Sequence, residues 1–482
     1  MNFKMVANLL GRSLCVEAIF LLPAIAVSLY FGEAQSARAL ALSFAATALT
    51  GGLMIALRPK KKNFYAREGF VTVAIAWLVI SLFGALPFYI SREIPSFIDC
   101  LFETISGFTT TGASILTDVE SLSRGLLYWR SFTHWLGGMG VLVFLLALLP
   151  STKGSGQSVF LLRAESPGPD VDKLVPRMHN SAKILYGIYI GMTLLEMLFL
   201  RLGGMPLFDT VTITFGTAGT GGFAIRSSSI AEYSAYLQSV VTIFMVLFSI
   251  NFNIYFLLLG RRFRQAVKNE ELWAFLGLLG GSILLISLNT RGFYQSFFES
   301  LHHAAFQAAS VMTTTGFATV DFNLWPEFSK CILLLLMVVG ACAGSTGGGI
   351  KVARLLLIVK SMHVGLRRMI SPRLVRPVRM DGKPVAEETL HGINLYMSAY
   401  FAILAISLLF VSFNDFGLET SISSVFACLN NIGPGFGVTG PMGSYASFSG
   451  FTKLILCADM LIGRLEILPI LLLFIPSVWK RT

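Results

Sequence analysis

The sequence predicts an all-α membrane protein in which two N-terminal helices precede four pseudo-symmetric helix–pore loop–helix repeats around a central pore. Composition is the first observation, because 54% of the 482 residues are hydrophobic, only 13% are charged, and the mean hydropathy is +0.71. A soluble domain carries about 25% charged residues. The second observation is that apolar runs of about 17–25 residues, enough for a helix to cross a bilayer, recur along the chain. The third is a short polar stretch, rich in Gly and Thr, of which the sequence contains four copies.

The first two apolar runs, residues 14–31 and 39–57, are expected to form two additional transmembrane helices within residues 1–67. Two basic residues precede the first run, as they would in a signal peptide. The run is too long for one, contains Glu17 and lacks a small-residue cleavage motif. We therefore expect it to be retained as a helix.

The distribution of basic residues predicts which loops face the cytoplasm. The formal net charge is +11, with five Lys or Arg residues in the stretch RPKKKNFYAR, four in RRFRQAVK and nine from Lys351 to Lys383. Cytoplasmic loops of multi-pass membrane proteins carry such an excess. The N-terminus and the C-terminus are then both cytoplasmic. The clusters indicate topology and contact with membrane lipid, and they do not favour a nucleic-acid partner.

After the N-terminal helices, the chain divides into four units, each with a span, a short apolar stretch, a polar turn and a returning span. The short stretches hold about 10–14 residues, which is too few to cross a membrane and indicates re-entrant half-helices. Irregular backbone at membrane depth is tolerated only where protein or a watery cavity surrounds it, so the four turns are expected to share one cavity. The predicted units are residues 68–152, 153–268, 269–370 (with an intramembrane Gly-rich loop) and 371–482. Their spans are expected at residues 70–90 and 128–149, 184–200 and 237–259, 272–288 and 331–366, and 393–413 and 451–479.

The polar turns have the composition of a cation site. A small cation that enters hydrocarbon loses a large hydration energy, so a pore must offer substitute oxygens. Backbone carbonyls supply them without a fixed negative charge. Gly permits the backbone angles that such a turn requires, and Thr adds a hydroxyl. Each half-helix also directs the negative end of its dipole at the cavity. These properties favour potassium over chloride.

Aligned on a glycine, the four turns read Thr-Thr-Thr-Gly112, Ala-Gly-Thr-Gly221, Thr-Thr-Thr-Gly316 and Ile-Gly-Pro-Gly435. One copy alone is more often a turn or a packing feature, but four copies at one place in four units indicate a shared ion site. Neighbouring glycines leave the second alignment open by one residue, and the fourth turn departs most from the others. The predicted potassium-binding selectivity filter consists of Thr111, Gly112, Thr220, Gly221, Thr315, Gly316, Pro434 and Gly435.

On these motifs the whole chain resembles the Trk/Ktr/HKT superfamily of potassium transporters, and within it the bacterial TrkH/TrkG branch. The resemblance implies four potassium-channel-like repeats around a central ion pore, with one filter glycine per repeat. It implies potassium uptake across the bacterial inner membrane, with K+ as the transported ion. It also implies a homodimer in which each protomer has its own pore, and a cytosolic, TrkA-like, nucleotide-binding ring as partner. The turns lack the Thr-Val-Gly-Tyr-Gly run of tetrameric potassium channels, so a shorter filter is expected.

The third returning span contains the stretch GACAGSTGGGIK, which is expected to form a gate below the filter. Each Gly costs up to about 1 kcal/mol in a helix relative to Ala, so these residues make sense at membrane depth if their backbone lines the pore. Close helix packing through small residues is the alternative interpretation, and the stretch lacks the ending of a phosphate loop. The gate prediction comprises Gly344, Ser345, Thr346, Gly347, Gly348 and Gly349.

Arg464 lies within the fourth returning span and is predicted to complete the gate. A charge within the membrane is costly and usually faces a cavity or a partner, and the resemblance places an arginine beside the loop. Pairing with Glu466 or Asp459 is the alternative. Glu103 and Glu299, within the predicted half-helices, either brace the filter or reach the outer surface.

Two other functions stand as alternatives to a channel-like pathway for potassium. A sodium- or proton-coupled potassium symporter is the alternative to a channel-like pathway, although few carboxylates fall within the spans. A membrane enzyme would need a nucleophile with a base, or a metal site, at membrane depth. The sequence offers neither, so no enzymatic activity and no bound organic cofactor are expected.

Overall fold

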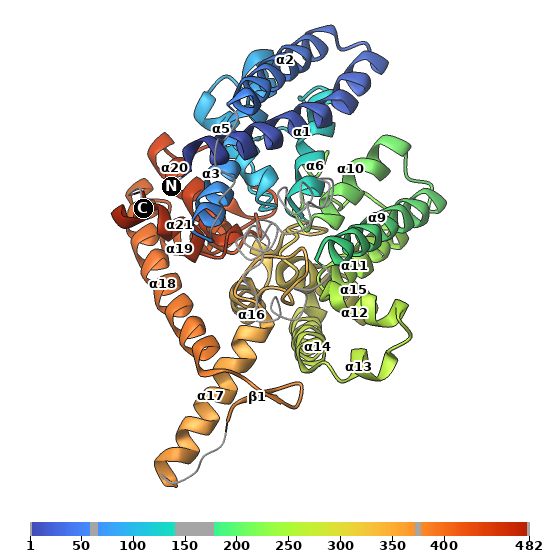
Figure 1. Cartoon of the computed structure of the whole chain (residues 1–482). Helices are drawn as coiled ribbons and strands as arrows, with labels where there is room; N and C mark the ends of the chain where they lie inside the picture. Colours follow the sequence, from blue (N-terminus) through green and yellow to red (C-terminus); the bar gives the residue numbers. More distant parts are fainter. Residues whose placement is uncertain (1, 58–65, 139, 141–177, 372–376, 480–482) are drawn as a thin grey trace.

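The computed structural model describes residues 2–57, 66–138, 140, 178–371 and 377–479. The predicted end of the first returning span, the boundary between the first two units and the basic residues from 153 to 177 lie outside these ranges. Within them the chain is almost entirely helical (Figure 1). The predicted all-α membrane architecture is therefore confirmed, while the unit boundaries drawn from the sequence stay predictions.

The two N-terminal helices form a tight hairpin. The helix α1 (Phe3–Tyr30) and the helix α2 (Ala34–Ala56) are joined by three residues, so they pack back on each other. Gly11 and Gly51 face each other, and a Cβ on Gly11 would lie 2.7 Å from the Gly51 carbonyl oxygen. Small residues allow such close approach between membrane helices. Both helices of the hairpin pack against the first repeat, α1 on its long and returning helices and α2 on the continuation of its long helix.

Each repeat contains a long helix, a half-helix and a returning helix. The long helices are α3 (Ala66–Gly84) with its continuation α4 (Leu86–Ser91), α9 (Met178–Leu202), α14 (Glu270–Thr290) and α18 (Glu387–Val411). The half-helices are α5 (Phe97–Phe108), α10 (Leu207–Ala218), α15 (Phe297–Met312) and α19 (Leu418–Leu429). The returning helices begin as α6 (Arg124–Gly138), α11 (Ala235–Phe248), α16 (Glu327–Val339) and α20 (Gly450–Arg464).

Shorter elements complete the chain. The returning helices of the second and third repeats continue after a break as α12 (Phe252–Leu259) and α17 (Val352–Ile370). The remaining elements are α13 (Phe263–Val267), η3 (Arg291–Phe293), η4 (Phe322–Leu324), the hairpin β1 (Arg379–Met380) and β2 (Lys383–Pro384), η5 (Ser412–Asn414), η6 (Gly437–Thr439), α21 (Leu468–Leu471), η7 (Leu472–Phe474) and α22 (Pro476–Trp479).

The half-helices begin at residues that are typical of helix N-termini. Ser96 and Ser296 cap α5 and α15 by accepting hydrogen bonds from the amides three residues later. All four half-helices carry an acidic residue in the first turn, where it complements the positive end of the helix dipole: Asp99, Asp209, Glu299 and Glu419. At about 1.5 Å per residue, helices of 12–16 residues are too short to cross the bilayer, as predicted.

The four repeats surround a common centre in chain order, as the colour sequence of Figure 1 shows. Each returning helix packs on the half-helix of the following repeat, in the pairs α6 with α10, α11 with α15, α16 with α19, and α20 with α5. Because α20 belongs to the last repeat and α5 to the first, these contacts close a ring. The ends of the four half-helices are thereby brought together.

The returning helices of the second, third and fourth repeats are interrupted near their middle, which the sequence predicted only for the third repeat. Among the described residues, six helices are long and apolar enough to span a membrane, and α11 with α12 would make a seventh if their 88° bend is counted within one span. The continuous spans predicted at 237–259 and 451–479 are wrong. Both breaks contain polar residues, Ser249 and Asn251 in the second repeat and Glu466 in the fourth, but the long apolar stretches around them conceal the breaks. The positive φ angles of Glu466 (+56°) and Ile467 (+65°) mark the fourth interruption.

Candidate ion pathway at the half-helix ends

All four half-helices end in the same backbone motif. The residue after each C-cap is left-handed, with φ of +55° at Thr110, +53° at Thr220, +58° at Thr314 and +56° at Asn431. The next amide then bonds back to the carbonyl five residues earlier, from Thr111, Gly221, Thr315 and Ile432, at 2.8–2.9 Å. This is the Schellman arrangement that ends many helices. Since Gly usually occupies the left-handed position, three Thr residues and one Asn there are an unusual and repeated feature.

Two residues after each left-handed residue comes a glycine that also has positive φ. The angles are +80° at Gly112, +74° at Gly222, +89° at Gly316 and +98° at Gly433. We call the four stretches 109–112, 219–222, 313–316 and 430–433 the filter phrases. In the first and third phrases the glycines with this conformation, Gly112 and Gly316, are the ones that the sequence alignment used. In the second and fourth phrases they are Gly222 and Gly433, whereas the sequence alignment used Gly221 and Gly435.

In the fourth phrase, the sequence alignment matched Gly435 to the other glycines without taking into account where the half-helix ends. Asn430 is the C-cap of α19, and Asn431 takes the left-handed position that Thr110 holds in the first phrase. Asn tolerates this conformation better than most residues. The predicted Pro434 and Gly435 therefore follow the filter phrase and lie outside it. The sequence feature that marks the end of this half-helix is the pair Asn430 and Asn431, which directly follows its apolar residues.

The four filter phrases meet one another in a closed ring. A Cβ added at Gly112 would collide with the carbonyl oxygen of Gly221, one at Gly222 with that of Thr315, and one at Gly316 with that of Ile432. The fourth contact closes the circle, because a Cβ at Gly433 would lie 2.6 Å from the Thr111 carbonyl oxygen. Each glycine is therefore required both by its backbone angle and by the neighbouring repeat.

Four carbonyl oxygens consequently gather at one place. Among the described residues, those of Thr111, Gly221, Thr315 and Ile432 accept no hydrogen bond. Buried carbonyls usually have a partner, and unpaired ones around a common point can replace the water shell of a cation. The arrangement can bind an alkali cation with neutral ligands. Of the predicted residues, it brings together Thr111, Gly112, Thr220, Gly221, Thr315 and Gly316.

Side-chain hydrogen bonds hold the filter phrases in shape. The hydroxyls of Thr109 and Thr111 lie 2.8 Å apart, and those of Thr313 and Thr315 repeat this distance. The Asn431 amide donates to the Thr111 hydroxyl at 2.9 Å, which ties the fourth phrase to the first. These hydrogen bonds stabilise the backbone turns of the filter phrases.

The predicted gate residues form a loop between α16 and α17, and this loop touches the filter. Gly340, Gly344 and Gly349 have φ of +69°, +68° and +74°, so at these three positions the backbone conformation favours glycine. The Gly348 amide donates to the hydroxyl of Thr314 at 2.6 Å. Gly347 and Gly348 face the carbonyls of the third and fourth filter phrases, and a Cβ on Gly347 would lie 3.0 Å from the Thr313 oxygen.

The other side of the loop is anchored to the break in the second repeat. The Cys342 amide donates to the Ser249 carbonyl at 3.2 Å, and the Phe252 amide donates to the Gly344 carbonyl at 3.0 Å. Buried Glu271 accepts from the amides of Ala343 and Ala353, at 2.6 and 3.1 Å. The loop thus replaces helical hydrogen bonds that both interrupted helices have lost.

Arg464 joins the loop to the first repeat. Its guanidinium donates to the Thr346 carbonyl at 2.8 Å and to the Gly138 carbonyl at 2.9 Å, and it also contacts the Gly137 carbonyl. The alternative partner Glu466 is instead paired with Arg354. Arg464 therefore bridges the loop and α6 by hydrogen bonds to main-chain oxygens. The predicted Ser345 lies in the same loop, where its hydroxyl donates to the Cys342 carbonyl at 2.7 Å.

Comparison with known proteins agrees with this geometry. A family model described as "TrkH: Cation transport protein" matches residues 35–279 and 296–481. The chain belongs to the TrkH family of cation transport proteins. It is 34% identical to the Trk system potassium uptake protein TrkH of Salmonella typhimurium, with all of both chains covered. It is 32% identical to the Trk system potassium uptake protein TrkG of Escherichia coli, with 99% of each chain covered.

A solved structure extends the likeness to three dimensions. The crystal structure of the potassium transporter TrkH from Vibrio parahaemolyticus superposes with a TM-score of 0.88 at 29% identity, and all of both chains are covered. The predicted resemblance to the Trk family is confirmed. The family is one of transporters, in agreement with the prediction that the protein is not an enzyme.

Within this TrkH-family fold, Glu103 and its partner Arg130 brace the chain segments that directly follow the first two filter phrases. It is buried on α5 and accepts from the Ser114 hydroxyl and the Ile115 amide, both at 2.9 Å. It also pairs with Arg130 of α6 at 2.6 Å, and Arg130 donates to the Ala224 carbonyl at 2.8 Å. The bracing interpretation is thus right for Glu103. Glu299 is exposed near the start of α15 and accepts from a local amide.

Several residues of the site were not predicted from the sequence: Gly222, Gly433, Asn431, Arg130 and His134. The two glycines and Asn431 could have been found by counting from the end of each half-helix. Arg130 carried the signal of a charge within an apolar span. His134 lies one turn after Arg130 on the same face of α6, and its contact with the second repeat became clear only with the structure.

Proposed function

We propose that the protein takes up potassium across the bacterial inner membrane through a channel-like pathway at the centre of the four repeats. The ring of filter phrases is the observation that carries this proposal, because it gathers four unpaired carbonyl oxygens from four repeats. Neutral carbonyl ligands favour an alkali cation over an anion. The relatives named as potassium uptake proteins support K+ as the ion.

We further propose that the loop at residues 344–349 and Arg464 gate this pathway. The hydrogen bond from Gly348 to Thr314 supports a loop that sits directly against the filter. A fixed positive charge near a cation pathway raises the barrier for K+. Arg464 is held there by main-chain oxygens of two different repeats, so withdrawal of the loop must break these bonds and move the charge.

Flux of K+ or Rb+ into proteoliposomes tests the proposed pathway. We expect Gly112→Ala and Gly316→Ala to abolish most of the flux, because both substitutions place a methyl group against a neighbouring carbonyl. Gly187→Ala on α9 is the matched control, since a Cβ there meets nothing within 4 Å. Undiminished flux in both filter variants would contradict the proposal.

A sodium- or proton-coupled symport remains a second candidate, supported by one observation. Glu196 on α9 is fully buried, and neither carboxylate oxygen has a hydrogen-bond partner among the described residues. A buried ionisable residue within a span is a candidate for ion or proton coupling. The reversal potential separates the two functions, because a channel-like pathway follows the K+ gradient alone and a symporter shifts with the second ion.

A cytosolic, TrkA-like, nucleotide-binding ring is the proposed regulatory partner. The end of α17 extends away from the body of the protein (Figure 1) and exposes an apolar face, formed by Met362, Leu366, Met369 and Ile370 with 60–84% exposure. The relatives belong by name to a Trk system, which supports a multicomponent assembly. We expect Leu366→Ser with Met369→Ser to weaken capture of the purified ring protein, and Leu395→Ser on α18 to leave it unchanged.

A homodimer is proposed on the family resemblance alone. Light scattering of the purified protein in detergent would measure its mass, and a monomer at all concentrations would contradict it. The cytoplasmic location of both termini is also proposed, supported by the basic loops.

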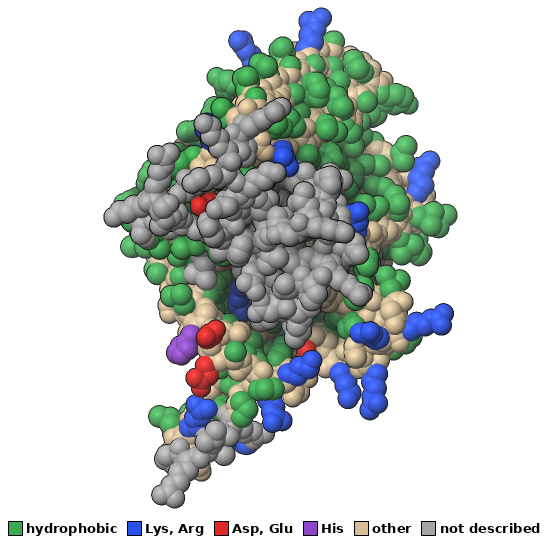
Figure 2. Space-filling model, viewed as in Figure 1, with side chains coloured by type: hydrophobic (Ala, Val, Ile, Leu, Met, Phe, Trp, Pro, Cys, Tyr) green, Lys and Arg blue, Asp and Glu red, His purple; other side chains and the backbone are tan. Residues whose placement is uncertain are grey.

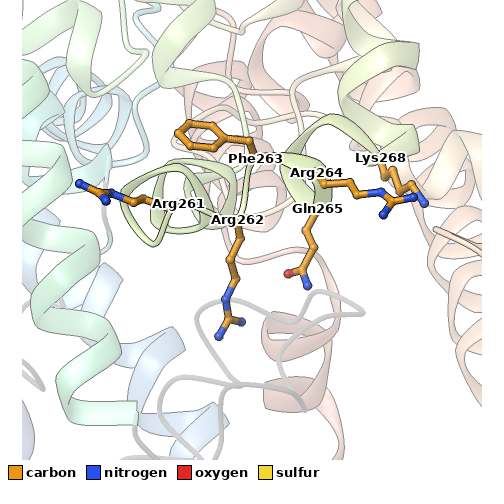
Figure 3. A pocket seen from close by; sticks show the side chains of 6 residues that line it. All are labelled: Arg261, Arg262, Phe263, Arg264, Gln265 and Lys268. Carbon is orange, nitrogen blue, oxygen red and sulfur yellow. The ribbon is translucent and has the colours of Figure 1, made fainter.

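Anionic membrane lipid is the proposed partner of the turn after α12. The pocket there is lined by Arg261, Arg262, Phe263, Arg264, Gln265 and Lys268 (Figure 3), and Lys and Arg side chains gather over α12 and α13 in Figure 2. Exposed apolar side chains flank it, with Phe263 at 59% and Trp273 at 58% exposure. Basic clusters at the membrane surface attract anionic headgroups, while interfacial aromatic rings sit at headgroup level.

Native mass spectrometry with phosphatidylglycerol and phosphatidylcholine tests this lipid contact. We expect substitution of the four cations in the pocket by Gln to reduce retention of phosphatidylglycerol. The matched control is Arg367→Gln with Arg368→Gln, which removes charge at the end of α17.

A further inference from the structure

One histidine of the first repeat lies directly behind the filter phrase of the second. His134, on α6, is fully buried, and its ring stacks on Phe223 with 4.1 Å between the ring centroids. Its Nδ1 accepts a hydrogen bond from the Phe223 amide at 3.4 Å. Phe223 follows the filter glycine Gly222, so the histidine holds the peptide group that links these two residues.

This peptide group fixes the direction of a filter carbonyl. A peptide is planar and trans, so its N–H and C=O point in opposite directions. Because the Phe223 N–H is directed at His134, the Gly222 carbonyl is directed away from α6. In the rest of the described filter, Ala113 and Phe317 donate their corresponding amides to no acceptor, and Pro434 has none to donate. Among the four filter phrases, the second is thus the one in which a side chain accepts a hydrogen bond from the peptide group after the last glycine.

The repeat symmetry shows that the histidine is an exception. His134 is the eleventh residue of α6, and the eleventh residues of the other returning helices are Met245, Met337 and Met460. All four side chains are fully buried. Three repeats therefore place a flexible apolar side chain where the first repeat places a rigid one with a hydrogen-bond acceptor.

The filter phrase beside the histidine is correspondingly altered. A Cβ on Gly221 would collide with the His134 ring, and its distance from the ring Cδ2 would be 2.6 Å. The equivalent residues in the other phrases carry side chains: Thr111, Thr315 and Ile432. The imidazole thus occupies the space beside Gly221 that a side chain would need, so the histidine and the glycine form a matched pair.

Resting on the proposed function, we propose that His134 is a positioning residue that orients the Gly222 carbonyl and thereby sets the K+ over Na+ preference of the second quarter of the filter. The backbone turn of this phrase lacks the pair of Thr hydroxyls that stabilises the first and third phrases. The bond from Phe223 to the imidazole takes over that role from a neighbouring repeat.

The test compares the ratio of K+ to Na+ permeation among variants in proteoliposomes. His134→Met, which copies the other repeats, removes the acceptor, and we expect the ratio to fall about fivefold, the factor given by the net free energy of one hydrogen bond. His134→Asn places an amide oxygen near the position of Nδ1 and should recover most of the ratio. Leu126→Met, a buried substitution two turns earlier on α6, should leave the ratio unchanged.

A second set of variants tests the matched pair by rescue. Gly221→Thr alone should abolish flux, since its side chain meets the imidazole. Combining it with His134→Met gives the residue types, Thr and Met, that serve the first and third phrases, and it should restore K+ flux to at least part of the wild-type level. The proposal is overturned if His134→Met keeps the wild-type ratio, or if the double variant is as inactive as Gly221→Thr while both run as folded protein in size-exclusion chromatography. Failure of the pathway proposal looks different, because wild-type protein itself would then show no selective K+ flux.

Discussion

The register of the fourth filter phrase gives the sharpest prediction. Gly433→Ala puts a methyl group on a residue with φ of +98°, and its Cβ would lie 2.6 Å from the Thr111 carbonyl oxygen and 2.8 Å from the Gly112 carbonyl carbon. Both neighbours are main-chain atoms of the first filter phrase, so neither can move aside without displacing a proposed ion ligand.

The size of the effect follows from the backbone. A non-glycine residue in the left-handed region costs about 1–2 kcal/mol, and the contact with the Thr111 oxygen adds to this cost. If the strain is relieved by shifting filter carbonyls, the free-energy preference for K+ over Na+ falls by a similar amount. That corresponds to a loss of about 5–30-fold in the permeation ratio.

The assay is the reversal potential under opposed K+ and Na+ gradients in planar bilayers. Gly435→Ala is the critical comparison, because the first alignment placed the filter glycine there. A Cβ on Gly435 would meet the hydroxyls of Thr439 and Ser423, at 2.6 and 2.9 Å, outside the filter ring. This variant should lower the melting temperature and keep the wild-type ratio. Gly187→Ala should change neither property.

The opposite result would refute the reasoning. If Gly435→Ala collapsed the permeation ratio while Gly433→Ala preserved it, the filter would not be the ring of glycines with positive φ.

Three further predictions concern the surroundings of the filter. Arg464→Ala should increase K+ leak in the absence of any cytosolic partner, because it removes the bonds that tie the loop to α6; a leak no higher than wild type in a flux assay would contradict this. Glu103→Gln should destabilise the protein by about 3–5 kcal/mol, since it leaves Arg130 buried without its counter-charge, and thermal unfolding in detergent would measure the loss. A hydrogen bond from Ser228 lowers the pKa of Glu232, which lies in the loop before α11. The stabilisation by Glu232 is therefore present above the ordinary carboxyl pKa and is lost as the pH falls through the lowered value. The stability of Glu232→Gln, measured by thermal unfolding, should depend less on acid pH than that of the wild type.

The sequence was most informative where one residue type carries one physical role. A short apolar stretch followed directly by a Thr-Gly turn predicted a half-helix of about 10–14 residues, and α5 has 12. The glycines Gly112 and Gly316 both have positive φ, because identical Thr-Thr-Thr-Gly stretches follow similar helix ends.

The sequence was less informative where different residues serve one backbone conformation. Asn431 does what Thr110 does in the first phrase, and only the helix end reveals that equivalence. The 88° bend after α11 was missed because its polar residues, Ser249 and Asn251, lie between two strongly apolar helices. Long-range contacts, such as that between His134 and the Phe223 amide, have no local signature.

Because a single polypeptide supplies all four quarters of the ring, the quarters share a backbone without sharing side chains. In an assembly of identical subunits, one codon change alters four positions at once. Here Asn431 differs from its counterpart Thr110, and Gly221 differs from its counterpart Thr315. Each difference affects only one quarter of the ring. In a chain with four repeats, a single substitution can therefore alter one quarter of the ring while the other three quarters keep their side chains.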